Sequence, residues 1–281
     1  MKERTQEQLK GQVKNFANKR SLMPQEVLQI FFMERVLERL SKSKYASNFI
    51  LKGGLLISSM IGVNERTTMD IDTTVTGIKM DESEIRIIMS EILSTEVGDG
   101  IIFQFNGIEP IREEDDYNNF CAHFKAIYGK IANDIKIDIT TGDAITPTFI
   151  DYSYKTILDG DVIPVKAYNK ETIIAEKYET IIRRNIGNTR ARDYYDLYKF
   201  YGLYRDEINI PMLKLAVEKT SKKRESEIIM TEWREIIEDM LNDIGLKNLW
   251  NNYSKANTYA ANISYTEIMK TVERVAEIIN S

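Results

Sequence analysis

Two aspartates separated by one residue, Asp70 and Asp72 in the segment MDIDTTV, are the pair whose type and spacing most directly indicate chemistry. The segment has the character of a strand, and side chains at positions i and i+2 of a strand point to the same side. Two carboxylates that close repel each other, and a bound cation is the usual resolution. Oxygen ligands suit Mg²⁺ or Mn²⁺, particularly where phosphate oxygens complete the coordination. The plainer interpretation is a solvent-exposed strand end.

A third carboxylate follows in the segment IKIDIT, residues 135–140. Its isoleucines alternate with Lys136, Asp138 and Thr140, which predicts a strand with one apolar and one polar face. We therefore expect Asp138 on the polar face of a sheet, where it can neighbour the two earlier aspartates and serve as a third metal ligand.

A glycine pair precedes the aspartates in LKGGLLISSMIG, which predicts a strand that turns into a helix. Glycine lets the backbone approach a phosphate closely, and the N–H groups at a helix start attract anions. Lys52, Gly53 and Gly54 are therefore candidate nucleotide-binding residues. A simple tight turn is the plainer interpretation of a Gly-Gly pair.

Lys177 lies within the apolar stripe of an expected helix, four residues after Ile173 and four before Ile181. A lysine there must extend to the edge of the stripe or meet an anion, and a triphosphate is a suitable anion. In ARDYYDLYKFY, Asp193 and Asp196 begin another helix, where the helix dipole is sufficient explanation for one of them.

A basic stretch, RRNIGNTRAR, lies between these two helices. Its arginines can contact phosphate or an RNA backbone, although a solvated helix end is the alternative. The candidate RNA-binding residues are Arg183, Arg184, Arg190 and Arg192. For a second basic stretch, KTSKKR at residues 219–224, we favour a solvated helix end.

The elements that must position these residues fall into two groups. Two helices are expected in the first fifty residues, and the second covers residues 24–41. They are followed by a helix capped by Asp81 and by strands around IIFQF, FCAHFKAIY and DIKIDIT. Beyond about residue 160 the sequence predicts helices over 170–185, 192–204, 211–220 and 226–245, and one from residue 265. This order predicts an α+β fold: a lobe of mixed sheet and helices over 1–160, then a helical lobe over 161–281 that contributes Lys177 and Asp193 to a cleft.

Composition limits the chemistry further. The chain has 281 residues, 43% of them apolar, a net charge of −5, one cysteine and one histidine. A Ser-His-Asp triad would have to use His123, and sites built on several thiolates or several histidines are excluded. We interpret His123, on an alternating strand, as a structural or exposed residue. The chemistry therefore depends on carboxylates, lysine and arginine.

Nothing in the sequence predicts a membrane partner or export. No apolar run approaches the roughly 20 residues of a membrane helix, and the N-terminal segment lacks the apolar centre of a signal peptide. A single cysteine fits a reducing compartment, so we expect the protein in the cytoplasm.

Taken in order, LKGG, RTTMDID, IKIDI, the lysine of AEKYETIIRR, and ARDYYDLYKF resemble the AbiEii/AbiGii toxins. These are nucleotidyltransferase-like toxins of type IV toxin–antitoxin and abortive-infection phage-defence systems, with the mycobacterial MenT toxins as relatives. The resemblance implies a DNA-polymerase-β-like nucleotidyltransferase lobe. It also implies catalytic roles for Asp70, Asp72, Lys177 and Asp193, and Asp138 joins them from the wider nucleotidyltransferase pattern.

The resemblance also implies a reaction and partners. Related toxins transfer a nucleotide from a nucleoside triphosphate, here GTP or CTP, to the 3′ end of tRNA and arrest growth, with Mg²⁺ or Mn²⁺ as cofactor. Their antitoxins act without a stable complex with the toxin. Leu55 stands where the family often has a hydroxyl residue, and Ser58 or Ser59 can substitute. The nucleotide-binding set is Lys52, Gly53, Gly54, Ser58, Arg66, Thr68 and Lys177.

Three other functions use some of the same residues. A transferase that attaches AMP to protein hydroxyl groups would use the same aspartates and glycines. A sugar-nucleotide glycosyltransferase can use the Asp-x-Asp pair but requires neither the glycine turn nor Lys177. A non-catalytic binding module would not depend on Asp70.

Overall fold

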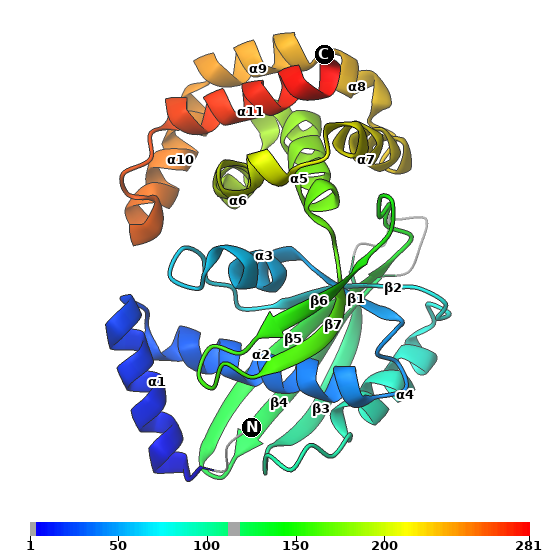
Figure 1. Ribbon diagram of the computed structural model, residues 1–281, viewed down its shortest axis with the longest axis vertical. Coiled ribbons are helices and arrows are strands. Elements are labelled where there is room, and N and C mark those ends of the chain that lie inside the picture. The colour runs from blue at the N-terminus through cyan, green and yellow to red at the C-terminus, as the bar shows by residue number, and fades with distance from the viewer. Residues whose placement is uncertain (1–3, 112–118) are drawn as a thin grey trace. The chain divides into compact units, whose positions relative to one another are not determined.

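The computed structural model describes residues 4–111 and 119–281, and the chain divides into two compact units (Figure 1). The first unit ends at Gly142 and also includes Ile150–Ala167; the second comprises Asp143–Phe149 and Tyr168–Ser281. Residue 160, the boundary expected from the sequence, lies within the first unit. In the part of the chain that is described, no helix combines the length and apolarity needed to cross a membrane.

A seven-stranded mixed sheet forms the centre of the first unit. Its order is β3-β4-β5-β2-β1-β7-β6, with β2 parallel to β5, β1 parallel to β7 and the other pairs antiparallel. This sheet with its helices confirms the α+β class. The strands are β1 Phe49–Lys52, β2 Ile71–Val75, β3 Ile102–Ile111, β4 Asn119–Tyr128, β5 Ile131–Thr141, β6 Ile150–Lys155 and β7 Val162–Ala167.

The hairpin of β6 and β7 was not predicted from the sequence, and β7 contains Pro164, a residue that sheets usually confine to edges and bulges. Strand β7 pairs with β1 only at Lys166 and Ala167, whereas Pro164 pairs with Ser153 of β6 alone. Proline has no backbone N–H to donate, and because β1 does not pair with β7 at Pro164, no hydrogen bond between these two strands is lost there.

The described residues of the first unit also form four helices: α1 Gln6–Arg20, α2 Pro24–Lys42, α3 Gly53–Ile61 and α4 Glu82–Leu93. Helix α2 contacts β5, β7 and α4, and Figure 1 shows it running along one face of the sheet. A buried ion pair of Arg39 with Asp99 fixes the C-terminal end of α2, and its two N–O distances are both 2.7 Å. Helix α4 begins, as expected, at Asp81, whose carboxylate accepts hydrogen bonds from the N–H groups of Ser83 and Glu84.

Glu34 of α2 is fully buried beneath the β6–β7 hairpin. Its Oε1 accepts a 2.8 Å hydrogen bond from the N–H of Ile157, and Tyr154 also contacts the carboxyl group. Burial raises the pKa of Glu34 to about 8, with the Arg35 charge partly opposing this effect.

We expect this carboxyl group to make the protein less stable as pH rises. Between pH 4.5 and about 8 the folded chain retains a proton at Glu34 that the unfolded chain has released, so the free energy of unfolding falls across this window and levels off above it. Glu34→Gln should flatten that slope, measured by denaturant unfolding across the window, whereas the exposed Glu82→Gln should retain it. An unchanged slope in Glu34→Gln would contradict this assignment.

The second unit is helical. Its helices are α5 Lys170–Arg184, α6 Ala191–Tyr204, α7 Ile210–Lys223, α8 Glu227–Thr231, α9 Trp233–Asn242, α10 Ile244–Ala256 and α11 Tyr265–Asn280. The prediction of one helix over 226–245 is wrong. Two helices, α8 and α9, occupy this segment, and α9 ends before Asp243. The Asp243 side chain instead accepts from the N–H of Leu246 at 2.6 Å and caps α10, which was not predicted.

Candidate active site

One face of the first unit's sheet carries a row of charged side chains from three neighbouring strands. Lys52 of β1 is opposite Asp72 of β2, and Asp72 is opposite Asp138 of β5. Residues in register on adjacent strands point to the same face, so this row is contiguous. The alternation expected for residues 135–140 is confirmed: the three isoleucines are buried and Asp138 is half-buried. Lys52 Nζ also donates to Thr140 Oγ1 at 2.7 Å.

The glycine pair lets the start of α3 approach Asp72. Gly53 has a φ of +61°, and a Cβ there would lie 2.1 Å from Asp72 Oδ2. The N–H of Gly54 donates to the same oxygen at 3.0 Å. The turn is therefore built around the carboxylate, because neither the backbone conformation nor the space admits a side chain.

We expect Gly53→Ala to be strongly disruptive. The left-handed conformation alone costs about 1–2 kcal/mol for a residue with a side chain, and the new methyl group must displace Asp72. Gly11→Ala in α1, where no atom lies within 4 Å of the added Cβ, should be neutral or stabilising. Denaturant unfolding of both variants checks this expectation, which fails if Gly53→Ala is as stable as Gly11→Ala.

Three residues of the expected nucleotide-binding set support this turn in the structure. A Cβ on Gly54 would lie 2.5 Å from Thr68 Oγ1 and 2.7 Å from the buried Arg66 guanidinium, which donates to the carbonyl of Gly54 at 3.3 Å. Ser58 is buried, and its hydroxyl donates to the carbonyl of Arg66 at 2.6 Å. Leu55 packs into the core. In this conformation the side chains of Arg66, Thr68 and Ser58 therefore position the turn, and their nucleotide contacts remain predictions.

Each aspartate of the site has a partner of its own. Asp70, immediately before β2, lies 3.3 Å from Lys136 Nζ, Asp72 accepts from Gly54, and Asp138 accepts from the Cys121 thiol. Burial raises the pKa of Asp138, and the charges of Asp72 and Asp70 add to the effect. Among the described residues, the oxygens of these three aspartates do not all approach within 4.8 Å of one another. The charges of the three aspartates still act on one another, and their binding of a cation stays a prediction.

In the second unit, Lys177 meets two carboxylates from the start of α6. Its Nζ lies 2.7 Å from Asp193 Oδ1 and 2.8 Å from Asp196 Oδ2, and both aspartates are buried. Arg190 Nε adds a 2.8 Å contact to the other oxygen of Asp193. Of the two alternatives that the sequence left open, the structure shows Lys177 meeting anions, which are carboxylates of this chain, and Asp196 was not expected as a partner. The i, i+3 spacing of the aspartates was the available signal. Binding of a triphosphate by Lys177 stays a prediction.

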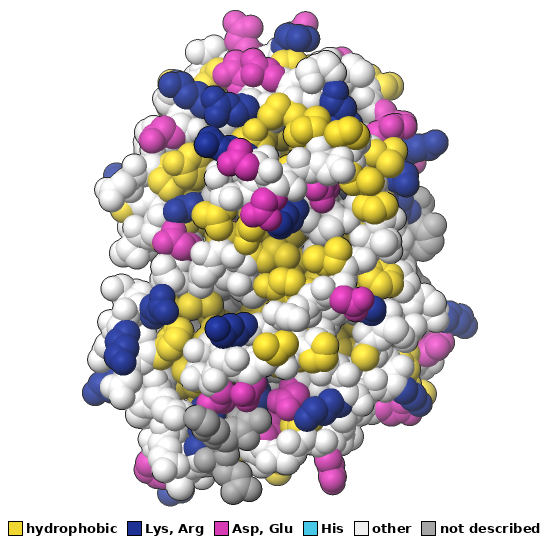
Figure 2. Space-filling model, viewed as in Figure 1, with side chains coloured by type: hydrophobic (Ala, Val, Ile, Leu, Met, Phe, Trp, Pro, Cys, Tyr) yellow, Lys and Arg dark blue, Asp and Glu magenta, His cyan; other side chains and the backbone are white. Residues whose placement is uncertain are grey.

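The arginines expected to contact RNA are partly engaged within the second unit. Arg183 Nε lies 2.6 Å from the buried Glu179, and Arg190 binds Asp193, whereas Arg192 is exposed. Glu179 also binds Arg224, so the interpretation of KTSKKR as simply solvated is wrong for that arginine. Figure 2 shows acidic and basic side chains interspersed on the visible face of each unit.

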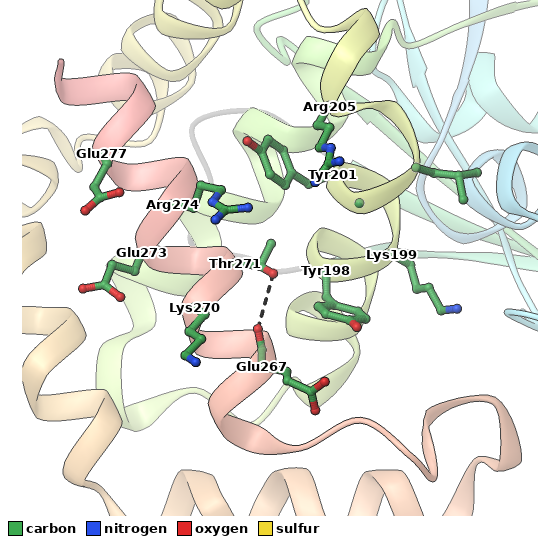
Figure 3. Close-up of a pocket in the computed structure, with 12 residues that line it drawn as sticks. Tyr198, Lys199, Tyr201, Arg205, Glu267, Lys270, Thr271, Glu273, Arg274 and Glu277 are labelled. Atoms are coloured by element: carbon green, nitrogen blue, oxygen red, sulfur yellow. Dashed lines mark hydrogen bonds between the residues drawn. The ribbon is translucent and has the colours of Figure 1, made fainter.

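A separate groove of about 540 Å³ lies in the second unit between α6 and α11, and contains none of the residues predicted from the sequence (Figure 3). Tyr201 lies beside Arg205 and Arg274 in this groove, and Glu267 and Glu273 also line it. Its charges are mixed in sign, so the groove by itself specifies no class of ligand.

The mixed sheet, the glycine turn held against an Asp-x-Asp pair, and a third aspartate on the adjacent strand match the arrangement expected of a nucleotidyltransferase-type protein. The fold resembles that of a Helicobacter pylori protein assigned as a nucleotidyltransferase, at 16% identity and a TM-score of 0.50, covering 92% of this chain and 98% of that one. The JHP933 protein from Helicobacter pylori aligns over 90% and 93% of the two chains, at 16% identity and a TM-score of 0.47.

Residues 35–276 match the family of the nucleotidyl transferase AbiEii toxin of type IV toxin–antitoxin systems, and the chain belongs to this family. This confirms the resemblance drawn from the five ordered motifs. No curated protein sequence matches the chain.

Proposed function

We propose that this AbiEii-family nucleotidyltransferase transfers a nucleoside monophosphate from GTP or CTP to an RNA acceptor, the 3′ end of tRNA, and thereby arrests growth. The observation that supports this most directly is the hydrogen bond of Gly54 to Asp72, with Asp138 alongside in register. It joins a backbone turn suited to phosphate with carboxylates suited to a cation.

Mg²⁺ or Mn²⁺ fits the donors of this site, because Asp70, Asp72 and Asp138 offer only oxygen atoms on one part of the sheet. Such an ion would supply charge stabilisation for the attacking and leaving oxygens of the transferred phosphoryl group. A bound ion would compete with the contacts of Asp70 with Lys136 and of Asp138 with the Cys121 thiol. Lys136 would then be released to attract a phosphate.

The protein groups have distinct roles in the proposed reaction. Asp138, whose pKa is raised by burial, accepts the proton of the acceptor hydroxyl or orients that hydroxyl. Lys52 and the Gly53–Gly54 turn bind the triphosphate. In the second unit, Lys177 is held by Asp193 and Asp196, and in the proposal this lysine and the four arginines supply positive charge for nucleotide or RNA phosphates.

Expression in a bacterium tests the biological part of the proposal. The intact chain should stop growth and leave tRNAs with extra nucleotides at their 3′ ends, detected by sequencing those ends. Asp70→Ala should permit growth and leave the ends unmodified. Growth arrest with unmodified tRNA would exclude tRNA as the acceptor, and arrest by Asp70→Ala would exclude the catalytic assignment.

The proposed partners also include an antitoxin that forms no stable complex with this chain. Co-expression with a candidate antitoxin gene, followed by purification of the tagged toxin, tests this. Rescue of growth without co-purification of the antitoxin is expected, and a stoichiometric complex would contradict it.

A further inference from the structure

The same face of the sheet carries a second set of metal-type donors on β3 and β4. Cys121 of β4 is directly opposite Glu109 of β3, and His123 lies two residues further along β4, on the same side. The position opposite His123 is Gly107, where no side chain competes for space. Register and a missing side chain thus direct one thiol, one imidazole and one carboxylate to the same place.

The distances within this cluster suit a small metal ion. The ligand atoms of Glu109, Cys121 and His123 all lie within 4.8 Å of one another, and His123 Nε2 is 2.9 Å from Glu109 Oε1. Tetrahedral zinc, with bonds of about 2.0–2.3 Å, holds its ligand atoms roughly 3.5 Å apart. Small side-chain rotations therefore suffice, since Glu109 and His123 are both solvent-accessible.

We propose that Glu109, Cys121 and His123 form a zinc-binding site separate from the site of Asp70 and Asp72. Sulfur and imidazole ligands favour zinc over magnesium, whereas the three aspartates offer only oxygen. Three protein ligands leave a fourth position for water. On binding, the thiol releases its proton to solvent and coordinates as thiolate, and no electron is transferred.

Composition alone did not predict this site, although the argument from it was right in what it excluded. It correctly excluded sites with several thiolates or several histidines, but a mixed site needs only one of each. Glu109 and Cys121 are far apart in the sequence, so their proximity cannot be predicted from a local pattern. It depends on the register of β3 and β4 and on the shift of that register between Phe105 and Gly107.

Cobalt substitution on the full-length chain, purified without a histidine tag, tests the proposal. One equivalent of Co²⁺ should produce tetrahedral d–d bands and a thiolate-to-cobalt charge-transfer band, both displaced by Zn²⁺. Because the chain has one cysteine and one histidine, such signals have unambiguous origins. Cys121→Ser should abolish the charge-transfer band, and His123→Gln and Glu109→Gln should each weaken Zn²⁺ binding by at least about tenfold, a loss that even outer-shell changes can cause.

Asp134→Asn is the matched control, since it removes an exposed carboxylate of the same sheet whose partner is Lys125. It should bind Zn²⁺ as the unmodified chain does. The proposal is overturned if the charge-transfer band is absent, if it persists in Cys121→Ser, or if His123→Gln and Glu109→Gln bind as tightly as the control. Circular dichroism of each variant verifies its fold, and the imidazole NMR signals of the unmodified chain should shift on Zn²⁺ addition.

Discussion

Asp72→Asn is expected to reduce nucleotide transfer by at least about a hundredfold while leaving the fold intact. The amide oxygen of asparagine can still accept the hydrogen bond from Gly54, so the turn is preserved. The substitution removes the negative charge that would bind the proposed cation. Loss of a single preorganised electrostatic contact to a transition state lowers the rate by a factor on the order of 10²–10³. The measurement is the transfer rate of purified protein with labelled nucleotide.

Asp134→Asn provides the control for this experiment as well. Its side chain is 80% exposed on β5, the strand that also carries Asp138, and its ion pair with Lys125 is long, at 3.6 Å. Transfer by this variant should equal that of the unmodified protein. If Asp72→Asn and Asp134→Asn are equally active, Asp72 has no catalytic role.

Lys177→Met is expected to cost both stability and activity. Its ammonium group is the shared partner of two buried carboxylates, and removing one member of a buried ion pair typically costs about 3–5 kcal/mol. The exposed pair of Lys166 and Asp151 offers the comparison, since Lys166→Met should change the free energy of unfolding by no more than about 1 kcal/mol.

A double variant separates the two roles of Lys177. Adding Asp196→Asn to Lys177→Met removes one buried charge and should recover part of the lost stability, measured by denaturant unfolding. Transfer activity should stay low, because the lysine charge is still missing. Recovery of activity together with stability would show that Lys177 is purely structural.

The parts of the site that follow the two-residue period of a strand were predictable from the sequence. Alternation in residues 135–140 placed Asp138 on the polar face, and the same reasoning placed Asp72 beside it once their strands were paired. The cap at Asp81 was also predictable, since it depends on spacing within one helix, whereas the contact of Lys177 with Asp193 joins two helices.

The rest depends on contacts between distant segments. No local pattern shows that Gly54 donates to Asp72, that Lys136 compensates Asp70, or that Cys121 donates to Asp138. The β6–β7 hairpin was not predicted either, and the place of Pro164 in it depends on where β1 stops pairing with β7.

The central claim is that the protein transfers nucleotides to RNA at the site formed by Asp70, Asp72 and Asp138. Its most direct test incubates the purified chain with Mg²⁺, total RNA, total protein and one labelled donor at a time, either a nucleoside triphosphate or a sugar nucleotide, and asks which polymer gains label. The account predicts label in RNA, from GTP or CTP, with the unmodified chain and none with Asp72→Asn. Label in protein, label only from a sugar nucleotide, or equal labelling of RNA by Asp72→Asn would contradict it.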